Sequence, residues 1–403
     1  MHVLLLNAAS QNDALRLATD GLAKAFSLQG CKVSLYDLRR LPPPPDFAES
    51  LMRAKAVDLI VTFFPAFGDY ERLGGVVVND AVKAPCVFLL SDYPLLHQQK
   101  LARMATSCIL LAADRSHARA IKSVFGADRF AYVGFQPSAA LGEEAPLPDD
   151  AEAFAAARPI AVLFSGSYAR PGDVPWKDYP EDIRKVFGDA ADIALGEDWV
   201  PPLDALEQAM TANGMTGDNP DVPPEDLRTM AILSRLVNEW VYTARRQRFF
   251  LAAARVGLPL TVCGAGFEAD VARYPNIDYR GIGDTAETLR LMRKARLTVS
   301  LNADCGEGTT PYVFSAMLGG SAAATETSAY YAEHFDDGED IALFRWSVLD
   351  DDLSRLLALS QDPEALFAMA KAGQRKVAAQ YRMDNLVDGI LAAVREGAET
   401  APA

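Results

Sequence analysis

Two series of short, uninterrupted apolar runs, with helix-like segments between them, constrain the fold more than any other feature of this sequence. The first series comprises residues 3–7, 33–38, 59–64, 87–91, 108–112 and 131–135, and the second comprises residues 160–165, 258–263, 277–279, 297–301, 321–325 and 341–344. Continuous rather than alternating apolar runs are typical of strands buried on both faces of a parallel sheet. The alternation of strand and helix therefore predicts an α/β fold of two Rossmann-like, doubly wound domains that face a cleft.

The domain boundaries are predicted from a stretch rich in Ala, Glu, Pro and Asp at residues 140–158, which is typical of a linker. We expect an N-terminal domain over residues 1–150 and a C-terminal domain over residues 156–380. The last segment, residues 381–403, is predicted to be a helix that crosses back to the N-terminal domain. Residues 171–250 contain no convincing strand, so they predict a helical insertion after the first strand of the C-terminal domain.

Charge and hydropathy exclude several partners. The chain has 39 Lys and Arg against 54 Asp and Glu, a formal net charge of −15, so it lacks the basic face that nucleic acid or an anionic membrane requires. Residues 171–228 carry 14 acidic and 4 basic side chains, which favours either a basic acceptor surface or another subunit as the partner of the insertion. No apolar run approaches the roughly 18 residues of a membrane helix, and no secretory signal is recognisable, so we expect a cytoplasmic protein.

Neither a metal site nor a bound cofactor is predicted. The five cysteines are scattered without C-x-x-C spacing, and the four histidines form no ligand motif. Asp350, Asp351 and Asp352 precede an apolar-rich stretch, so a charged helix start explains them better than a metal site does.

Small residues follow three of the predicted strands in the second domain. They are Gly166 with Ser167, then Gly264, Ala265 and Gly266, and then Gly281, Ile282 and Gly283. Ligands of open α/β sheets bind beyond the carboxyl ends of the strands, and glycine lets a ligand approach bare backbone there. Glycine also serves simply to turn the chain, so each of these pairs alone is a weak indication of a site.

The strongest local signal is the stretch from Asn302 to Pro311, which reads NADCGEGTTP. It predicts a strand, a glycine-rich loop and a helix with proline in its first turn. Free backbone N–H groups and the positive end of the helix dipole suit the binding of a diphosphate. The hydroxyls of Thr309 and Thr310 are further hydrogen-bond donors. No G-K-[ST] follows, so this is not a Walker loop. The alternative is a glycine loop that only avoids a neighbouring domain.

Seven stretches carry a family resemblance. They read YRGIGDTAETLRLMRKARLTVSLN, GEGTTPYVFSAMLGG, EHFDDGEDIALF, AKAGQRKVAAQYRMDNLVDGIL, RPIAVLFSGSY, RRQRFFLAAARVGLPLTVCGAGFE and, in the first half, APCVFLLSDYP. Together they resemble the bacterial, spore-maturation CgeB-type glycosyltransferases and, more distantly, other glycosyltransferases of the two-Rossmann GT-B fold. The resemblance covers most of the chain except the insertion. It implies transfer of a sugar from a nucleotide-diphosphate donor to a protein, glycan or small-molecule acceptor, without a bound metal ion.

The same resemblance implies a role for individual residues. The Gly306–Thr310 loop would hold the diphosphate, the Gly281–Gly283 backbone the nucleobase, and Arg248 would neutralise the donor phosphates. The donor-binding candidates are Gly166, Ser167, Arg248, Gly264, Gly281, Ile282, Gly283, Asn302, Gly306, Gly308, Thr309, Thr310 and Ser315. Two positions depart from the family pattern: Ser315 replaces the glutamate that grips the ribose, and Tyr312 replaces an arginine.

A catalytic base, if the reaction inverts the sugar configuration, is expected from the N-terminal domain. The candidates are Asp92, Asp13 and Asp69, each of which follows a predicted strand. Asp92 stands where the resemblance points, although Asp-x-Pro is equally a turn signal. His334 lies near a strand end of the second domain and is a further candidate to line the cleft.

Two other functions stay open. One is a sugar-nucleotide epimerase on the same fold, although this chain is poor in the histidines that such chemistry uses. The other is a degenerate glycosyltransferase that only binds its ligand, an idea that Ser315 and Tyr312 support.

Overall fold

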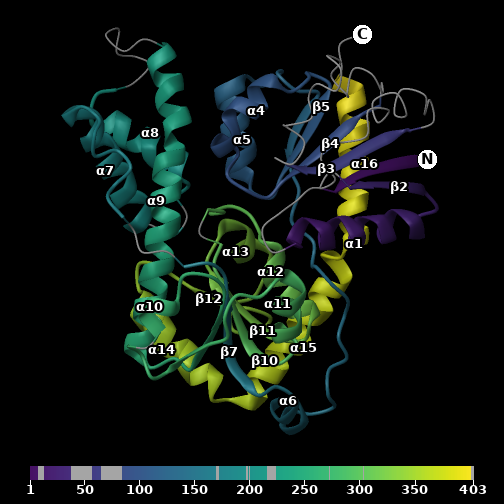
Figure 1. Cartoon of the computed structure of the whole chain (residues 1–403), viewed down its shortest axis with the longest axis vertical. Coiled ribbons are helices and arrows are strands. Elements are labelled where there is room, and N and C mark those ends of the chain that lie inside the picture. Colours follow the sequence, from purple (N-terminus) through teal and green to yellow (C-terminus); the bar gives the residue numbers. More distant parts are fainter. Residues whose placement is uncertain are drawn as a thin grey trace. The chain divides into compact units, whose positions relative to one another are not determined.

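The computed structural model describes the chain as two compact units (Figure 1). The described residues are 1–7, 13–37, 57–64, 84–168, 172–196, 198, 200–215, 224–271, 273–302 and 304–400. The first unit comprises Met1–Leu141 and Tyr381–Ala403, and the second comprises Gly142–Gln380. None of the described helices is long and apolar enough to cross a lipid bilayer.

The first unit is built on a six-stranded sheet in the order β2-β1-β3-β4-β5-β6, with every pair parallel. Its strands are β1 (His2–Asn7), β2 (Lys32–Asp37), β3 (Leu59–Phe64), β4 (Cys86–Leu90), β5 (Cys108–Ala112) and β6 (Tyr132–Phe135). Its described helices are α1 (Ala14–Leu28), a 3-10 helix at Pro94–His97, α4 (Gln98–Arg103), α5 (Arg115–Phe125) and α16 (Met383–Thr400). The first series of apolar runs therefore forms the strands that the sequence predicts.

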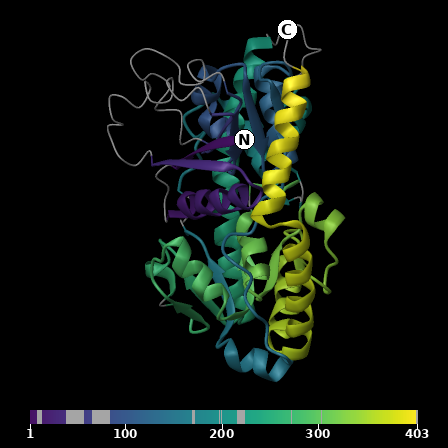
Figure 2. The ribbon, with the colours of Figure 1, turned by 90° about the vertical axis from the view of Figure 1, so that its right-hand side faces the viewer.

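Both faces of this sheet are covered, because successive side chains of a strand point to opposite faces. Val3 and Leu5 of β1 pack in one core with α1 and α16, and Leu4 and Leu6 pack in the other with α4 and α5. Figure 2 shows α16, in yellow, alongside this unit, where it contacts α1. The last helix thus contributes to the core of the first unit.

The second unit has its own six-stranded parallel sheet, in the order β12-β11-β10-β7-β8-β9. Its strands are β7 (Ile160–Ser165), β8 (Leu260–Cys263), β9 (Ile277–Tyr279), β10 (Ala295–Ser300), β11 (Ala322–Glu326) and β12 (Ala342–Phe344). Its helices are α6 (Ala151–Ala157), α7 (Glu181–Gly196), α8 (Pro202–Ala212), α9 (Pro224–Val256), α10 (Glu268–Val271), α11 (Thr285–Met292), α12 (Pro311–Leu318), α13 (Ala329–His334), α14 (Leu349–Ser360) and α15 (Pro363–Gln380). Because all the strands are parallel, their carboxyl ends share one edge, which we call the carboxyl edge.

The predicted insertion is a helical lobe with a core of its own. α7, α8 and the first part of α9 lie side by side (Figure 1). They enclose a core that includes Trp176, Phe187, Leu206 and Val237. Further along the same helix, Phe249 and neighbouring side chains pack into the core of the sheet. α9 therefore joins this insertion lobe to the rest of the unit as one continuous element.

The described boundary between the units lies at Leu141 and Gly142, earlier than the predicted end of the first domain at residue 150. The reason is that the linker-like segment packs on the second unit. The Ala145 N–H donates to the Leu318 carbonyl at 3.1 Å, and Gln374 Nε2 donates to the Ala145 carbonyl at 2.7 Å. Composition alone suggested a linker, but its backbone is paired with α12 and α15.

Arg158, between α6 and β7, is a buried arginine whose substitution is expected to lower the free energy of unfolding. It is 4% exposed and donates to the carbonyl oxygens of Met292, Arg293, Ala295 and Gly319 at 2.8–3.3 Å, and burial lowers its pKa to about 10. Arg158→Met leaves these buried carbonyls without their donor, so we expect a loss of about 3 kcal/mol or more in the free energy of unfolding. Urea denaturation measures it.

The matched control is Arg255→Met. The side chain of Arg255 is 60% exposed and its ion pair with Asp350 is exposed as well, so its loss is expected to change stability by less than about 1 kcal/mol. Equal effects of the two substitutions would contradict the role of Arg158.

Candidate functional site

The loops after β7 and β8 meet backbone to backbone at the carboxyl edge. The Gly166 N–H donates to the Cys263 carbonyl at 3.0 Å, and the Tyr168 N–H donates to the Ala265 carbonyl at 2.8 Å. A Cβ atom on Gly264 would lie 2.1 Å from the carbonyl oxygen of Gly166. Any larger residue at position 264 would therefore clash with the backbone of the loop after β7.

Gly264 was a predicted ligand contact, and its backbone groups have partners within the protein. Its N–H donates to the Gly281 carbonyl at 3.0 Å, and its carbonyl accepts the Tyr279 hydroxyl at 3.0 Å. Both backbone groups are thus used within the protein, and contact of Gly264 with a ligand stays a prediction.

The loop after β9 presents an apolar side chain to solvent. Ile282 is 66% exposed and lies between Gly281, at φ +80° with open space around it, and Gly283. A Cβ atom on Gly283 would lie 3.1 Å from Cys263 Sγ, so this glycine packs on β8. Ile282 is the only large hydrophobic residue in the described part of the second unit that is exposed in this way.

The 302–310 loop follows β10 and leads into α12, as the sequence predicts. Thr310 is the N-cap of α12 and Pro311 occupies its first turn. Asn302 is 3% exposed, and its Nδ2 donates to the carbonyls of Cys305 at 2.9 Å and Gly308 at 3.4 Å. The loop therefore turns around a buried asparagine.

A second segment, residues 326–331 at the end of β11 and the start of α13, holds this loop in place. The bonds between them are Asn302 N to Glu326 Oε2 (2.7 Å), Ala329 N to Gly306 O (3.0 Å), Ser328 Oγ to Gly308 O (3.0 Å) and Thr310 N to Tyr331 Oη (3.2 Å). Glu326 and Tyr331 did not appear among the sequence candidates. The only local signal was Ser328, which caps α13 through the N–H of Tyr331.

Two arginines of α9 lie near the carboxyl edge with different partners. Arg246 Nη1 donates to the Ser167 carbonyl at 2.5 Å and to Ser167 Oγ at 3.2 Å, and its guanidinium lies 4.1 Å from the centre of the Tyr242 ring. Arg248 instead donates to the carbonyls of Leu195 at 3.2 Å and Trp346 at 2.6 Å. Arg246, rather than the predicted Arg248, is therefore the cation beside the turn after β7.

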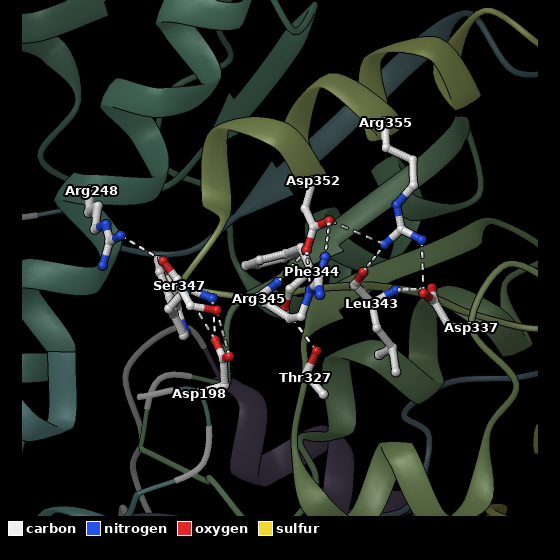
Figure 3. A network of polar contacts seen from close by, with 11 residues as sticks. Asp198, Arg248, Thr327, Asp337, Leu343, Phe344, Arg345, Ser347, Asp352 and Arg355 are labelled. Atoms are coloured by element: carbon white, nitrogen blue, oxygen red, sulfur yellow. Dashed lines mark hydrogen bonds and ion pairs between the residues drawn. The ribbon is translucent and has the colours of Figure 1, made fainter. Parts of the chain in front are cut away.

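Figure 3 shows what Arg248 does instead. Together with Asp198 it ties the end of α7 to the loop after β12. Asp198 Oδ1 accepts the N–H groups of Trp346 at 2.5 Å and Ser347 at 3.3 Å, and Asp198 Oδ2 accepts Ser347 Oγ–H at 2.9 Å. Beside them, Arg345 pairs with the buried carboxylate of Asp352 at 3.0 Å. The network attaches the insertion lobe to the sheet.

The comparisons with known proteins agree with this arrangement. Residues 245–392, which include the 302–310 loop and α13, match the family model described as "Glycosyl transferase-like". HepE from Anabaena, solved with UDP-glucose, is 14% identical with a TM-score of 0.51, over 99% of each chain. Sucrose-phosphate synthase from Thermosynechococcus elongatus is 12% identical with a TM-score of 0.55, over 100% of each chain. The fold is that of the GT-B glycosyltransferases.

A third GT-B match is an α-glucosyltransferase solved with UDP and a 13-mer DNA containing a HMU base. It is 10% identical with a TM-score of 0.52, over 98% of this chain and 99% of that one. None of the curated proteins is similar enough in sequence to match. The predicted pair of Rossmann-like domains with a helical insertion is confirmed, and the match over residues 245–392 agrees with the predicted glycosyltransferase.

Two hydroxyls predicted to face the donor of a GT-B enzyme are buried here. Ser315 is 2% exposed and its Oγ donates to the Pro311 carbonyl at 2.6 Å, one turn earlier in α12. Thr309 is 1% exposed. The Ser315 hydroxyl is therefore used within the helix, and a contact of Ser315 with the donor stays a prediction.

The base candidates of the first unit differ in their surroundings. Asp92 follows β4, is 56% exposed, and its Oδ2 lies 3.8 Å from Nε2 of His97. Asp13, just before α1, pairs with Arg16 at 3.0 Å in a left-handed conformation with φ 62°. Asp69 lies outside the described residues. His334 stacks on Tyr330 at 4.1 Å.

Metal ligands do not gather in the described ranges. No group of three or more His, Cys, Asp or Glu side chains there is arranged to hold a metal ion. The aspartates at 350–352 form the first turn of α14, as predicted for a helix start.

Proposed function

We propose that this chain is a glycosyltransferase that binds a nucleotide-diphosphate sugar at the carboxyl edge of its second unit and transfers the sugar to a protein, glycan or small-molecule acceptor. The observation that carries the proposal is the 302–310 loop, which is held by the 326–331 segment and leads into the N-terminus of α12. It lies inside the span that matches a glycosyltransferase family model. Within the GT-B fold, the quoted stretches favour the CgeB type and a cytoplasmic bacterial enzyme.

The proposed donor is a UDP-sugar. The matched HepE structure contains UDP-glucose and the matched α-glucosyltransferase contains UDP, which makes uracil the base to test first. Exposed Ile282 offers the flat base an apolar surface, and the backbone of Gly281 to Gly283, in which the Gly281 carbonyl already accepts the Gly264 N–H, is proposed to bind the edge of the base. The diphosphate is proposed to meet the 302–310 loop.

Transfer without a metal ion is proposed on the chemistry of the same edge. The α12 dipole and the Arg246 guanidinium supply positive charge where a diphosphate brings negative charge. Residues 171–228 carry 14 acidic and 4 basic side chains, about two thirds of the net charge, and most of this segment forms the insertion lobe rather than the 302–310 loop; salt also screens exposed charges over about 8 Å. The net charge of the chain therefore does not oppose an anionic donor.

Thermal unfolding with UDP, GDP and dTDP tests the donor. A nucleotide at about 100 times its Kd stabilises a protein by about 2.7 kcal/mol, which raises Tm by a few degrees. We expect UDP to raise Tm most, and Gly308→Asp, which places a carboxylate in the loop, to abolish the shift. Unchanged Tm with all three nucleotides would refute the proposal. UDP release from a UDP-sugar then reports transfer or hydrolysis.

Asp92 is the proposed general base toward the acceptor hydroxyl. Because Asp92 belongs to the first unit, we expect Asp92→Asn to lower kcat while the KM of the donor stays unchanged. Asp13→Asn is the control, since Asp13 is paired with Arg16. Steady-state kinetics with both variants decide; equal kcat values for the wild type and Asp92→Asn would exclude Asp92.

A further inference from the structure

Two buried oxygen atoms under the 302–310 loop have no hydrogen-bond partner among the described residues. They are Oε1 of Glu326 and Oδ1 of Asn302. The two residues lie at the carboxyl ends of the neighbouring strands β11 and β10, and each is 3% exposed. A buried acceptor without a donor costs free energy, so this pair calls for an explanation.

The orientation of Asn302 is fixed by its neighbours. Its Nδ2 faces the carbonyl oxygens of Cys305 and Gly308, and a flipped amide would turn Oδ1 toward both of them. Oδ1 is therefore an acceptor that needs a hydrogen.

Two donors reach the same oxygen of Glu326. Asn302 N–H donates to Oε2 at 2.7 Å, and Thr325 Oγ–H donates to the same oxygen at 3.3 Å. Oε1 is left without a donor, beside a residue whose Oδ1 also lacks one. A proton on Oε1 would make that oxygen a donor, which is what Oδ1 of the hydrogen-bonded neighbour Asn302 lacks.

The charged and titratable groups around Glu326 come from several elements. Arg245 of α9 favours the ionised carboxylate electrostatically, but its guanidinium donates to the Ala194 carbonyl and lies over the Trp346 ring at 5.2 Å. Tyr331 of α13 faces the loop as a neutral phenol, since burial raises its pKa well above the usual value, and Cys305 lies near it. Burial raises the pKa of Glu326 above its ordinary value despite Arg245.

We infer that Glu326 is a positioning residue that holds the 302–310 loop as a neutral carboxylic acid, accepting the Asn302 N–H through Oε2 and donating its own proton to Asn302 Oδ1. This inference rests on the proposed function only in taking the loop as the donor site. Ionisation removes the O–H donor and leaves a charge in a buried site, which loosens the loop. Because the native state keeps this proton above the ordinary pKa, the contribution of Glu326 to stability is lost as pH rises through its native pKa.

The experiment compares wild type, Glu326→Gln and Glu326→Ala across pH 5 to 9. Glutamine keeps both an acceptor for the Asn302 N–H and a donor for Oδ1, so we expect its Kd for UDP to match the wild-type value at low pH and to stay constant as pH rises. Alanine loses both bonds, so we expect Kd to rise at least about fivefold at every pH. Glu333→Gln, an exposed acid on the same helix α13, is the control and is expected to behave as wild type.

Two results would overturn the inference. If Glu326→Gln weakens UDP binding as much as Glu326→Ala at every pH, the ionised carboxylate is what the loop needs. If wild type and Glu326→Gln show the same pH dependence, the titrating group lies elsewhere.

A ligand-free measurement separates this inference from the donor assignment. Infrared spectra at neutral pH are expected to show a protonated carboxyl carbonyl band in the wild type that Glu326→Gln lacks, and Tm of the wild type is expected to fall relative to Glu326→Gln as pH rises. Both measurements can be made without a nucleotide. If no nucleotide binds, the proposed function is refuted, but the inference about Glu326 is still tested. Absence of both the band and the relative fall would refute the neutral carboxyl.

Discussion

Replacing Gly266 with alanine is expected to lower the free energy of unfolding of the second unit by about 4 kcal/mol or more. Gly266 has φ +94°, and a Cβ atom there would lie 1.8 Å from the carbonyl oxygen of Tyr168. The obstacle is backbone, so a change of side-chain rotamer cannot relieve it. Alanine therefore adds a clash to an unfavourable conformation.

Tyr168 cannot move aside, because its ring is packed in an aromatic group. It is 6% exposed, stacks on Phe267 with ring centres 5.1 Å apart, and lies 5.1 Å from Phe250 of α9. Any shift of the Tyr168 backbone therefore disturbs the core of the unit.

Gly257→Ala is the matched control for the backbone strain alone. Gly257 has φ +77°, and a Cβ atom there would meet open space. We expect it to cost about 1 kcal/mol, the ordinary penalty for alanine in place of a glycine of positive φ. Urea denaturation and circular dichroism compare the variants, and equal losses would show that the close approach at Gly266 is relieved without cost.

The same glycines explain why the sequence predicted the sheet better than the site. A strand buried on both faces must be continuously apolar, so both series of strands were visible in the sequence. Gly264 was predicted as a ligand contact, but a Cβ atom on Gly264 or Gly266 would meet the backbone of Gly166 or Tyr168, which precede the insertion in the sequence. Whether a glycine faces a ligand or another loop depends on that long-range approach, which local sequence does not contain.

Glu326 and Tyr331 were missed for a related reason. Both are buried side chains whose importance comes from holding another loop, and neither stands in a motif with fixed spacing. The start of α11 at Asp284 is by contrast a local signal, because Asp284 and Glu287 stand three residues apart and the Asp284 carboxylate accepts the Glu287 N–H at 2.8 Å. Features set by neighbouring residues could thus be predicted from the sequence, and contacts between distant loops could not.

Arg246→Ala is expected to raise the Kd of UDP about 10- to 100-fold, the usual value of one or two hydrogen bonds to a charged group. Residues 246 and 248 are two positions apart on α9, so they point to different sides of the helix. Of these two arginines, Arg246 is the one that the described residues show in contact with the turn after β7, where the resemblance places the donor, through the carbonyl and hydroxyl of Ser167.

Arg248→Ala is the control that makes this prediction sharp, because it removes the same charge from the same helix. Its partners are the carbonyls of Leu195 and Trp346, so we expect it to lower the free energy of unfolding by about 1 kcal/mol with little change in Kd. Calorimetric titration with UDP and urea denaturation separate the two effects. A larger rise in Kd for Arg248→Ala than for Arg246→Ala would show that Arg248, the residue that the family resemblance implies, binds the phosphates. A rise in the Kd of UDP for Arg246→Ala alone would show that Arg246 binds the donor. The side of α9 on which an arginine lies would then decide whether it meets the donor.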